Sequence, residues 1–454
     1  MKKQTMSLAV ASALLVGGSG AFGNMYVNDR GLGETLIYPF YSANANNDTY
    51  VHVVNTTSLV KAVKVRFIEA QNSQEVLDFN LYLSPYDEWA GAITRTEDGG
   101  ALIRTADTSC TVPELGTPNP PFDGSQTELD DGTIIRDQPF VDFLYAAQDP
   151  GNADISRTLE GYVEIIEMGQ LESIKPANWP LDDEDYADWL EDDDNDKGWA
   201  ATHNEDGVPN GCAKLVKAWD EAPTGAWRVS ADDELLSTWD GGGLYGYGIL
   251  INVEDGAAAG YDSTAIDTFV DPLFHIPGEL HQEPGNTQPS LADAQEFVTI
   301  FNEGAAEDYE MADGLDAVSA ILMATDIAND YVIDEGRKSR TDWVITMPTK
   351  RQYVNVDDDE DAIPPFTNEW DGNKACEEVA VGFWDREEAF EEIEAGSGFS
   401  PRPPSAEPGK TELCTEVSVL GFGSESAVNA SASIYSGLNE QITEAGYQEG
   451  WARV

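Results

Sequence analysis

Basic residues are scarce in this chain of 454 residues. It has 25 lysines and arginines against 84 aspartates and glutamates, which gives a formal net charge of −59 at pH 7. Such a charge repels nucleic acid and anionic lipid and attracts cations. The chain also has 41% hydrophobic and 10% aromatic residues, which is enough to bury real cores and excludes a disordered acidic tail. The composition therefore predicts a folded polyanion with no nucleic-acid partner.

Long hydrophobic runs are missing as well. The apolar stretch at residues 6–16 is too short to cross a bilayer core, which needs about 20 residues. It follows Lys2 and Lys3 and leads to Ala21-Phe22-Gly23, with small residues at both ends of the tripeptide. This three-part pattern is typical of a secretory signal peptide. We expect residues 1–23 to be removed, the mature chain to be secreted, and no transmembrane segment to remain.

Catalytic motifs are the third absence. The sequence contains no HExxH and no GxSxG motif, and its four histidines are scattered. Residues 241–246 formally match GxGxxG, but a strand-like segment follows them, whereas a dinucleotide site needs a helix there. Two of the many carboxylates could in principle serve a glycosidase, but nothing in the sequence singles out a pair. The sequence therefore predicts no catalytic residue and no enzyme.

The residues that are present form clear strand patterns. Residues 61–68 alternate apolar side chains with Lys64 and Arg66, and residues 76–83 alternate apolar and polar side chains in the same way. Alternation with a period of two predicts strands with one face in a core and the other in water. Further strands are expected at 50–54, 159–168, 227–229, 244–253, 342–347 and 416–420.

Two segments have helical patterns, residues 290–301 after a Ser290 N-cap and the alanine-rich residues 315–332. The overall pattern predicts a mainly β protein. We expect an antiparallel β-sandwich, Ig-like or jelly-roll-like, with long loop insertions and a few short helices. The expected organisation is a signal peptide at 1–23, N-terminal strands at 24–110, an acidic Trp- and Pro-rich insertion at 111–226, and further strands with helices and a second insertion at 227–454.

The four cysteines all lie in the part expected to be exported. An even number of cysteines in an oxidising compartment favours disulfides, and four cysteines allow three pairings. We favour Cys110–Cys212 and Cys376–Cys414, because each pair brackets a polar stretch rich in Pro and Asp. Each bond would then close the base of an excursion from the main fold.

Two clusters of acidic residues are candidate calcium sites. Asp192, Asp194 and Asp196 alternate along the chain, as calcium ligands in loops often do. The spacing fails as an EF-hand, because Lys197 replaces the glycine and His203 replaces the final glutamate. The second cluster contains Asp357, Asp359 and Asp361. Either cluster could instead be part of a solvated acidic surface.

Tryptophans gather between residues 179 and 227, within and just after the expected insertion. Aromatic faces among carboxylates can stack against sugars, so Trp189 and Trp199 are candidate carbohydrate-binding residues. The alternative is that these rings anchor a small core of the insertion itself, a common use of buried tryptophan.

Two stretches carry a resemblance to other proteins. The sequences VKVRFIEAQNSQEVLDFNLYLSPYDEWAGAI (63–93) and TDWVITMPTKRQYV (341–354) resemble segments of secreted proteins of marine gammaproteobacteria. That largely uncharacterised group includes proteins similar to surface-layer (S-layer) and other cell-surface structural proteins. The resemblance covers about a tenth of the chain and brings no catalytic residues. It implies a β-rich exported protein that is assembled at the cell surface with divalent cations.

These observations lead to one functional expectation and one alternative. We expect a non-enzymatic, S-layer-like structural protein that self-associates on the outer surface, with Ca²⁺ bridging acidic loops of a strongly charged chain. Outer-membrane polysaccharide is a candidate anchoring partner. The alternative is a secreted carbohydrate-binding or carbohydrate-degrading protein that uses the tryptophan-rich insertion.

Overall fold

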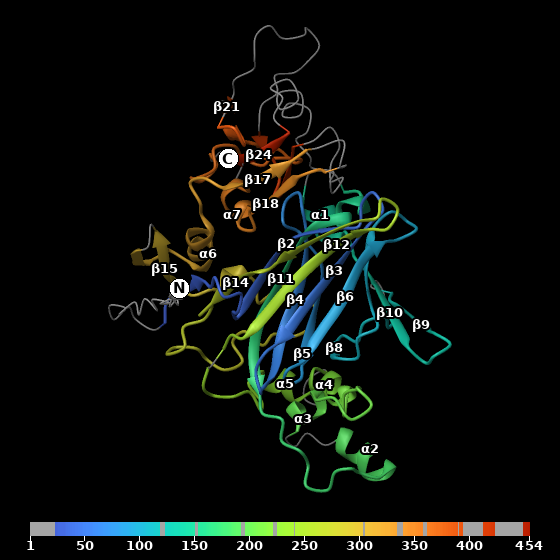
Figure 1. Cartoon of the computed structure of the whole chain (residues 1–454). Helices are drawn as coiled ribbons and strands as arrows, with labels where there is room; N and C mark the ends of the chain where they lie inside the picture. Colours follow the sequence, from blue (N-terminus) through green and yellow to red (C-terminus); the bar gives the residue numbers. More distant parts are fainter. Residues whose placement is uncertain are drawn as a thin grey trace, which may run out of the picture.

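The alternating segments form two seven-stranded antiparallel sheets at the centre of the molecule (Figure 1). This computed structural model describes residues 23–118, 123–149, 153–191, 196–220, 225–239, 241–302, 305–333, 339–356, 361–388, 390–393, 412–422 and 448–454. The expected signal peptide therefore lies outside the described residues, apart from Gly23. None of the described helices is long and apolar enough to span a membrane.

The first sheet has β11 near its middle, between β2 and β4. Its β-branched and aromatic residues suit a pleated, buried surface. In spatial order its strands are β1 (Tyr26–Val27), β14 (Thr264–Asp267), β2 (Thr35–Ser42), β11 (Glu160–Leu171), β4 (Val60–Glu69), β5 (Glu75–Leu83) and β8 (Cys110–Val112).

The second sheet lies face to face with the first. Side chains from both sheets form one shared core, which includes Phe67 and Phe79 of the first sheet and Trp89 and Ile103 of the second. The strands of the second sheet, in spatial order, are β13 (Ala257–Asp262), β12 (Leu244–Asn252), β3 (Asn47–Asn55), β6 (Glu88–Arg95), β7 (Ala101–Thr105), β10 (Ile134–Pro139) and β9 (Ser125–Glu128).

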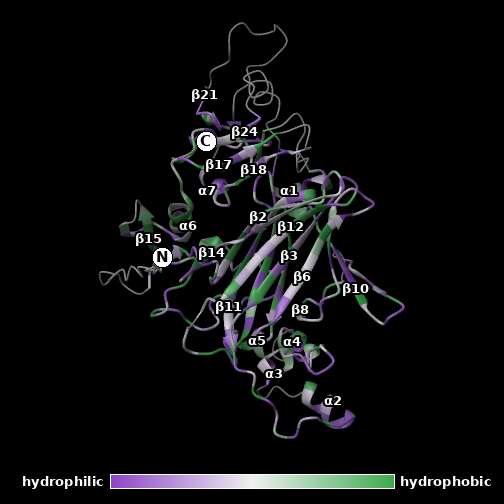
Figure 2. Cartoon of the chain, in the orientation of Figure 1, coloured by the Kyte–Doolittle hydropathy of each residue, from purple (hydrophilic) through white to green (hydrophobic). Residues whose placement is uncertain are grey.

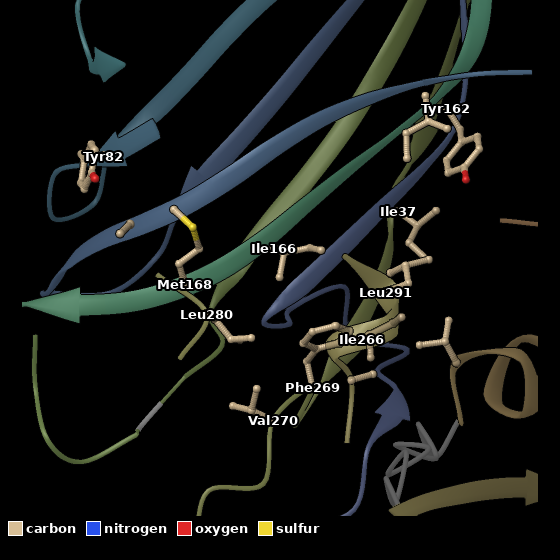
Figure 3. Packing of buried hydrophobic residues seen from close by; sticks show 14 of the residues in the cluster. Ile37, Tyr82, Tyr162, Ile166, Met168, Ile266, Phe269, Val270, Leu280 and Leu291 are labelled. Carbon is tan, nitrogen blue, oxygen red and sulfur yellow. The ribbon is translucent and has the colours of Figure 1, made fainter. Parts of the chain in front are cut away.

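The first sheet is buried on both faces, and this corrects the expectation that one face of its strands meets water. Every residue of β4 and of β11 is buried. The face turned away from the second sheet packs against a second core, part of which is shown in Figure 3. There Ile166 and Met168 of β11 lie near Phe269 and Leu280 from loops beyond the sheets. The alternation correctly predicts strands, but it does not reveal that later segments cover the second face.

Short helices connect and cap the sheets. Helices α3, α4 and α5 gather at one end of the sheets, with α2 beyond them (Figure 1), and α2 is largely hydrophilic (Figure 2). The helices are α1 (Phe143–Gln148), η1 (Ile155–Leu159), α2 (Asp183–Glu191), α3 (Lys197–Ala201), α4 (Cys212–Ala218), α5 (Ala226–Val229), η2 (Leu291–Asp293), α6 (Gly314–Leu322) and α7 (Lys350–Val354).

Smaller sheets form the C-terminal part, most of which lies at the other end of the large sheets, whereas β15 lies at their side near the N-terminus (Figure 1). A small core that includes Tyr331, Phe383 and Phe422 holds part of this region together. The strands are paired as β15 (Phe297–Asn302) with β16 (Ala305–Glu310), β18 (Asp342–Thr346) with β23 (Val417–Gly421), β19 (Glu377–Glu378) with β22 (Glu412–Leu413), and in the order β17 (Ala328–Val332), β24 (Glu449–Arg453), β20 (Val381–Asp385), β21 (Phe390–Ile393).

Three local predictions were wrong wholly or in part. Residues 227–229 belong to the helical turn α5, where the Trp227 ring stacks on Tyr82 with ring centroids 5.2 Å apart. The segment 290–301 begins with a Ser290 capping box but continues for only one 3₁₀ turn, and its β-branched residues then form β15. The segment 315–332 divides into α6 and β17. Short apolar runs are ambiguous between helix and strand, so packing partners decide between them.

Both expected disulfides are present. Cys110 at the start of β8 is bonded to Cys212 at the start of α4, and Cys376 is bonded to Cys414. The first bond ties the helical region that follows β11 back to the edge of the first sheet. The favoured pairing among the three alternatives is therefore confirmed.

Candidate functional site

Charged side chains gather on the covered face of the first sheet. Neighbouring strands are in a register that places Glu164 of β11, Arg66 of β4 and Asp78 of β5 in one row. Side chains directly opposite each other on one face of a sheet interact most strongly. Because segments beyond the sheet cover this face, these charges are withdrawn from water, where an unpaired charge would be very unfavourable.

The two cations of β4 on this face, Lys64 and Arg66, are paired. Arg66 Nε donates to Glu75 Oε2 over 2.7 Å, and its Nη1 donates to Glu164. Lys64 forms an ion pair with Asp78 and donates to the Asn286 carbonyl over 2.6 Å. Burial alone would lower the pKa of Arg66, but the two carboxylates outweigh burial and raise it. The guanidinium is therefore a permanent charge that holds three strands together.

A second buried group lies where β4 and β11 meet a glycine turn. Lys61 Nζ donates to Glu167 Oε1 over 2.6 Å, and both side chains are fully buried. The backbone N–H of Gly242 donates to Glu167 Oε2 over 2.9 Å. Gly242 has a φ of 88°, which favours glycine. The glycines of the GxGxxG match thus form a turn that leads into the strand β12, as the sequence predicts. The turn contacts a carboxylate.

Glu34 lies beside this pair and has an unusual protonation equilibrium. Its carboxyl accepts hydrogen bonds from Trp239 Nε1 over 2.9 Å and from the Val270 N–H over 3.1 Å. Burial, followed by the negative charge of Glu167, raises the pKa of Glu34 to about 8. The Glu34 carboxyl is therefore mainly protonated at neutral pH.

A buried arginine links the large sheets to the C-terminal part. Arg157 donates to Glu69 over 2.8 Å and to Asp149 over 3.0 Å. Asp149 also accepts a hydrogen bond from Trp370 Nε1 over 3.1 Å. Burial raises the pKa of nearby Glu416 to about 8, although the charge of Lys350 opposes the shift. This group joins residues that are more than 200 positions apart in the sequence.

His281 is enclosed by aromatic rings at the end of the first sheet. The rings of Trp219 and Trp227 lie 4.9 and 4.7 Å from the imidazole. His281 Nδ1 lies 2.8 Å from the Ala231 carbonyl, and Nε2 lies 3.1 Å from the Tyr82 hydroxyl. Burial lowers the pKa of His281 to about 4, so at neutral pH Nδ1–H donates to the carbonyl while Nε2 accepts from Tyr82.

One set of residues resembles a hydrolase triad in composition but not in geometry. Ser84 Oγ lies 2.8 Å from His203 Nδ1, and Asp87 Oδ2 lies 3.6 Å from the same nitrogen. In a working triad the hydroxyl and the carboxylate contact opposite ring nitrogens, which lets the carboxylate orient the ring for proton transfer. Here both contact Nδ1, so this arrangement does not form that relay.

A polar cavity of about 410 Å³ opens beside Arg66. Tyr162, whose hydroxyl lies 2.8 Å from Ser73 Oγ, forms part of its wall together with Arg351 of α7. The cavity thus presents two guanidinium groups, but the Arg66 charge is already matched by Glu75 and Glu164. Its chemistry suits hydrogen bonding to a small polar molecule rather than bond cleavage.

The candidate calcium residues are only partly described. Asp192, Asp194, Asp357 and Asp359 lie outside the described residues. Asp196 precedes α3 and accepts a hydrogen bond from Trp189 Nε1 over 3.1 Å, and Asp361 is exposed. Within the described part of the chain, one group has metal-ligand proximity, Cys376, Glu412 and Cys414. Its two sulfurs form a disulfide, which removes them as thiolate ligands.

The candidate sugar-stacking tryptophans lie together. Trp179 contacts Trp189 at 5.2 Å and Trp199 at 5.7 Å between ring centroids, in both cases edge to face. The ammonium groups of Lys214 and Lys175 lie over Trp189 and Trp199 at 4.9 and 5.6 Å. The rings therefore pack mainly on one another and on lysines, which is the arrangement of a small local core.

Comparison with known proteins adds no family to this description. No protein-family model matches the chain, and neither curated proteins nor solved structures give a match.

The buried ion pairs were not predicted from the sequence, although a signal for them exists there. Lys64 and Arg66 lie on the polar face of one expected strand. Glu164 and Asp78 lie on the polar faces of two other expected strands. Opposite charges on the polar faces of strands that pair are typical of cross-strand ion pairs. The signal is indirect, because the order of strands in the sheet is needed to recognise which charges meet.

Glu34 gives a pH prediction. Its folded pKa of about 8 lies above the ordinary value of 4.5, so the folded state binds the proton more tightly than the unfolded state. The stability from this group is fully present below pH 4.5 and is lost as pH rises through 8. We expect the free energy of unfolding to fall by up to about 1.4 kcal/mol per pH unit between pH 6.5 and 8.

Chemical denaturation at several pH values measures this slope, and Glu34→Gln is the control because it cannot ionise. An unchanged slope in Glu34→Gln would contradict the assignment.

His281 acts in the opposite direction, because its folded pKa of about 4 lies below its ordinary value. Its contribution is present above pH 6.5 and is lost as pH falls through 4. Stability should therefore be greatest at mildly acidic pH.

Proposed function

We propose that this chain is a non-enzymatic structural protein of the cell surface, similar to S-layer proteins, which is exported and self-associates. Ca²⁺ would bridge acidic loops within or between copies. The observation that carries the proposal is the unequal distribution of the two signs of charge between interior and surface.

Basic side chains are buried far more often than acidic ones. Seven basic and seven acidic side chains are buried in the described part of the chain, although the full sequence has 84 acidic residues and only 25 basic ones. The buried basic residues are Lys61, Lys64, Arg66, Arg157, Lys197, Lys214 and Lys350. Equal numbers of basic and acidic side chains are therefore buried in the described part of the chain, so burial withdraws only a small share of the acidic groups that give the net charge of −59.

This distribution supports assembly that depends on cations. Two copies with such surfaces repel each other unless counter-ions neutralise the contacts between them. Divalent hard cations accept carboxylates from several loops at once, which monovalent ions do less well. The paired buried charges and two disulfides add rigidity that suits a structural role outside the cell.

We also propose that the two face-to-face sheets are a sandwich of the Ig-like or jelly-roll-like kind. The shared core and the antiparallel pairing support this assignment. The alternative function, carbohydrate binding or degradation through Trp189 and Trp199, has less support, because these rings pack on one another and on lysine ammonium groups.

The calcium dependence is directly testable. We expect the purified mature protein to form high-order assemblies on titration with CaCl₂ and to return to small species with EDTA, as followed by light scattering. Titration with NaCl to the same ionic strength is the control for screening of charge. If the protein stays monomeric throughout both titrations, the proposal is wrong. If NaCl alone gives the same assemblies, self-association stands without calcium bridges.

A further inference from the structure

A hollow of about 310 Å³ lies on the outer face of the second sheet, the face turned away from the shared core. We call it the tyrosine hollow and define it by Tyr245, Tyr247 and Ile249 of β12 and Gly260 and Asp262 of β13. Strand register explains why these residues meet, because Tyr247 is paired with Asp262 and Ile249 with Gly260. The volume is at the lower end of the range for ligand pockets, roughly 300–1,000 Å³.

The Tyr247 ring is held so that one of its faces borders the hollow. Its other face stacks on His52 of β3, with centroids 4.4 Å apart and an angle of 7° between the planes. Glu88 fixes this pair, because its carboxylate accepts from the Tyr247 hydroxyl over 3.2 Å and lies 2.9 Å from His52 Nδ1. Since β3 and β13 flank β12 on opposite sides, the free face of Tyr247 points toward β13 and Asp262.

Gly260 keeps the floor of the hollow open. A Cβ atom built at this position would meet nothing closer than the Gly248 carbonyl at 3.8 Å, and the backbone there does not require glycine. The Tyr245 ring lies 5.9 Å from the Tyr247 ring and forms a second aromatic wall. Asp262 is exposed and supplies a carboxylate at the rim.

The chemistry of these walls selects among ligands. Two aromatic rings and a carboxylate attract an organic cation, because ring faces are negative and cation–π contacts strengthen when the cation is partly desolvated. The surrounding charge of −59 adds to this attraction and opposes anionic ligands. A sugar is held mainly by many hydrogen bonds, and the described side chains that line the hollow offer only tyrosine hydroxyls and the Asp262 carboxylate for them.

We propose that the tyrosine hollow binds a quaternary ammonium group, such as that of a choline-type molecule. The methyl groups would lie against the free face of Tyr247 and against Tyr245, and the positive charge would face Asp262. The ammonium group needs no hydrogen-bond partner, so the aromatic faces and the carboxylate of the hollow suffice to hold it. This inference does not depend on the assembly proposed above.

Isothermal titration with choline at constant ionic strength tests the proposal, with 3,3-dimethylbutanol as an uncharged analogue of the same shape. We expect choline to bind and the uncharged analogue to bind much more weakly. Tyr247→Ala should weaken choline binding roughly three- to thirtyfold. Asp262→Asn should weaken it as well, and Gly260→Leu should abolish it by filling the hollow.

The control variant is Tyr309→Ala, which removes an exposed tyrosine from β16 outside the two large sheets and should bind choline normally. Equal binding of choline and its uncharged analogue would overturn the proposal, and so would unchanged choline binding in both Tyr247→Ala and Gly260→Leu. Sedimentation with phosphatidylcholine vesicles, compared with phosphatidylglycerol vesicles, then distinguishes a lipid headgroup from a free solute as the source of the ammonium group.

Discussion

Replacing Lys61 with methionine is expected to lower the free energy of unfolding by about 3–5 kcal/mol. Lys61 Nζ lies 2.6 Å from Glu167 Oε1, and both side chains are fully buried. Methionine fills a similar volume but leaves the Glu167 carboxylate without its cation, next to Glu34. Removing one partner of a buried pair is more damaging than removing both, because the remaining charge stays in a poorly solvating environment.

The double variant Lys61→Met with Glu167→Gln should therefore be more stable than Lys61→Met alone, since glutamine still accepts from the Gly242 N–H without a charge. The matched control is Arg104→Met. The Arg104–Asp137 pair has a similar length of 2.7 Å, but the Arg104 side chain is 50% exposed, and exposed pairs contribute about 1 kcal/mol or less. Urea unfolding measures all three variants. A loss in Lys61→Met no larger than in Arg104→Met contradicts the argument.

Removing the Cys110–Cys212 disulfide by replacing both cysteines with alanine should destabilise the protein by about 2–5 kcal/mol. The bond closes a loop of 102 residues, and a crosslink that closes a long loop removes much conformational entropy from the unfolded chain. It also ties α4 to β8, so we expect the loss to be accompanied by faster proteolysis in the residues between the cysteines. Differential scanning calorimetry with limited proteolysis measures both effects.

The Cys376–Cys414 bond is the internal comparison, because it closes a loop of 38 residues. In the loop-entropy model its removal should cost about 1 kcal/mol less than removal of the first bond. Equal thermal stability of the Cys110/Cys212 double variant and the unaltered protein would show that the first bond does not stabilise the folded state.

The sequence was most informative where a strand follows a strict alternation. Val63, Val65 and Phe67 identified β4 correctly, and the polar stretches between the cysteines identified the disulfide pairing. It was least informative about what lies against each face. Lys64 and Arg66 have the pattern of solvated residues, yet later segments bury them. Period-two patterning shows that two faces differ in chemistry, but a face of paired charges and a face in water give the same pattern.

The tyrosine hollow has a partial signal in the sequence. Tyr245 and Tyr247 alternate with glycines in β12, which indicates two rings on one face of a strand. The neighbours that complete the hollow, Gly260 and Asp262, come from the next strand, and His52 comes from a strand almost 200 residues earlier. Only the order of strands in the sheet brings these groups together.

The position of β11 in the first sheet has a consequence for the order in which the chain folds. β2 and β4 are close in sequence, but β11 pairs with both and separates them. The first sheet therefore stays divided until residues 160–171 have paired with both strands. These residues begin roughly ninety positions after β4 ends, so the pairing is a long-range one. Until then the inner edges of β2 and β4 have no partner, and such edges invite pairing with other chains. We expect refolding to be slow and to lose yield at high protein concentration.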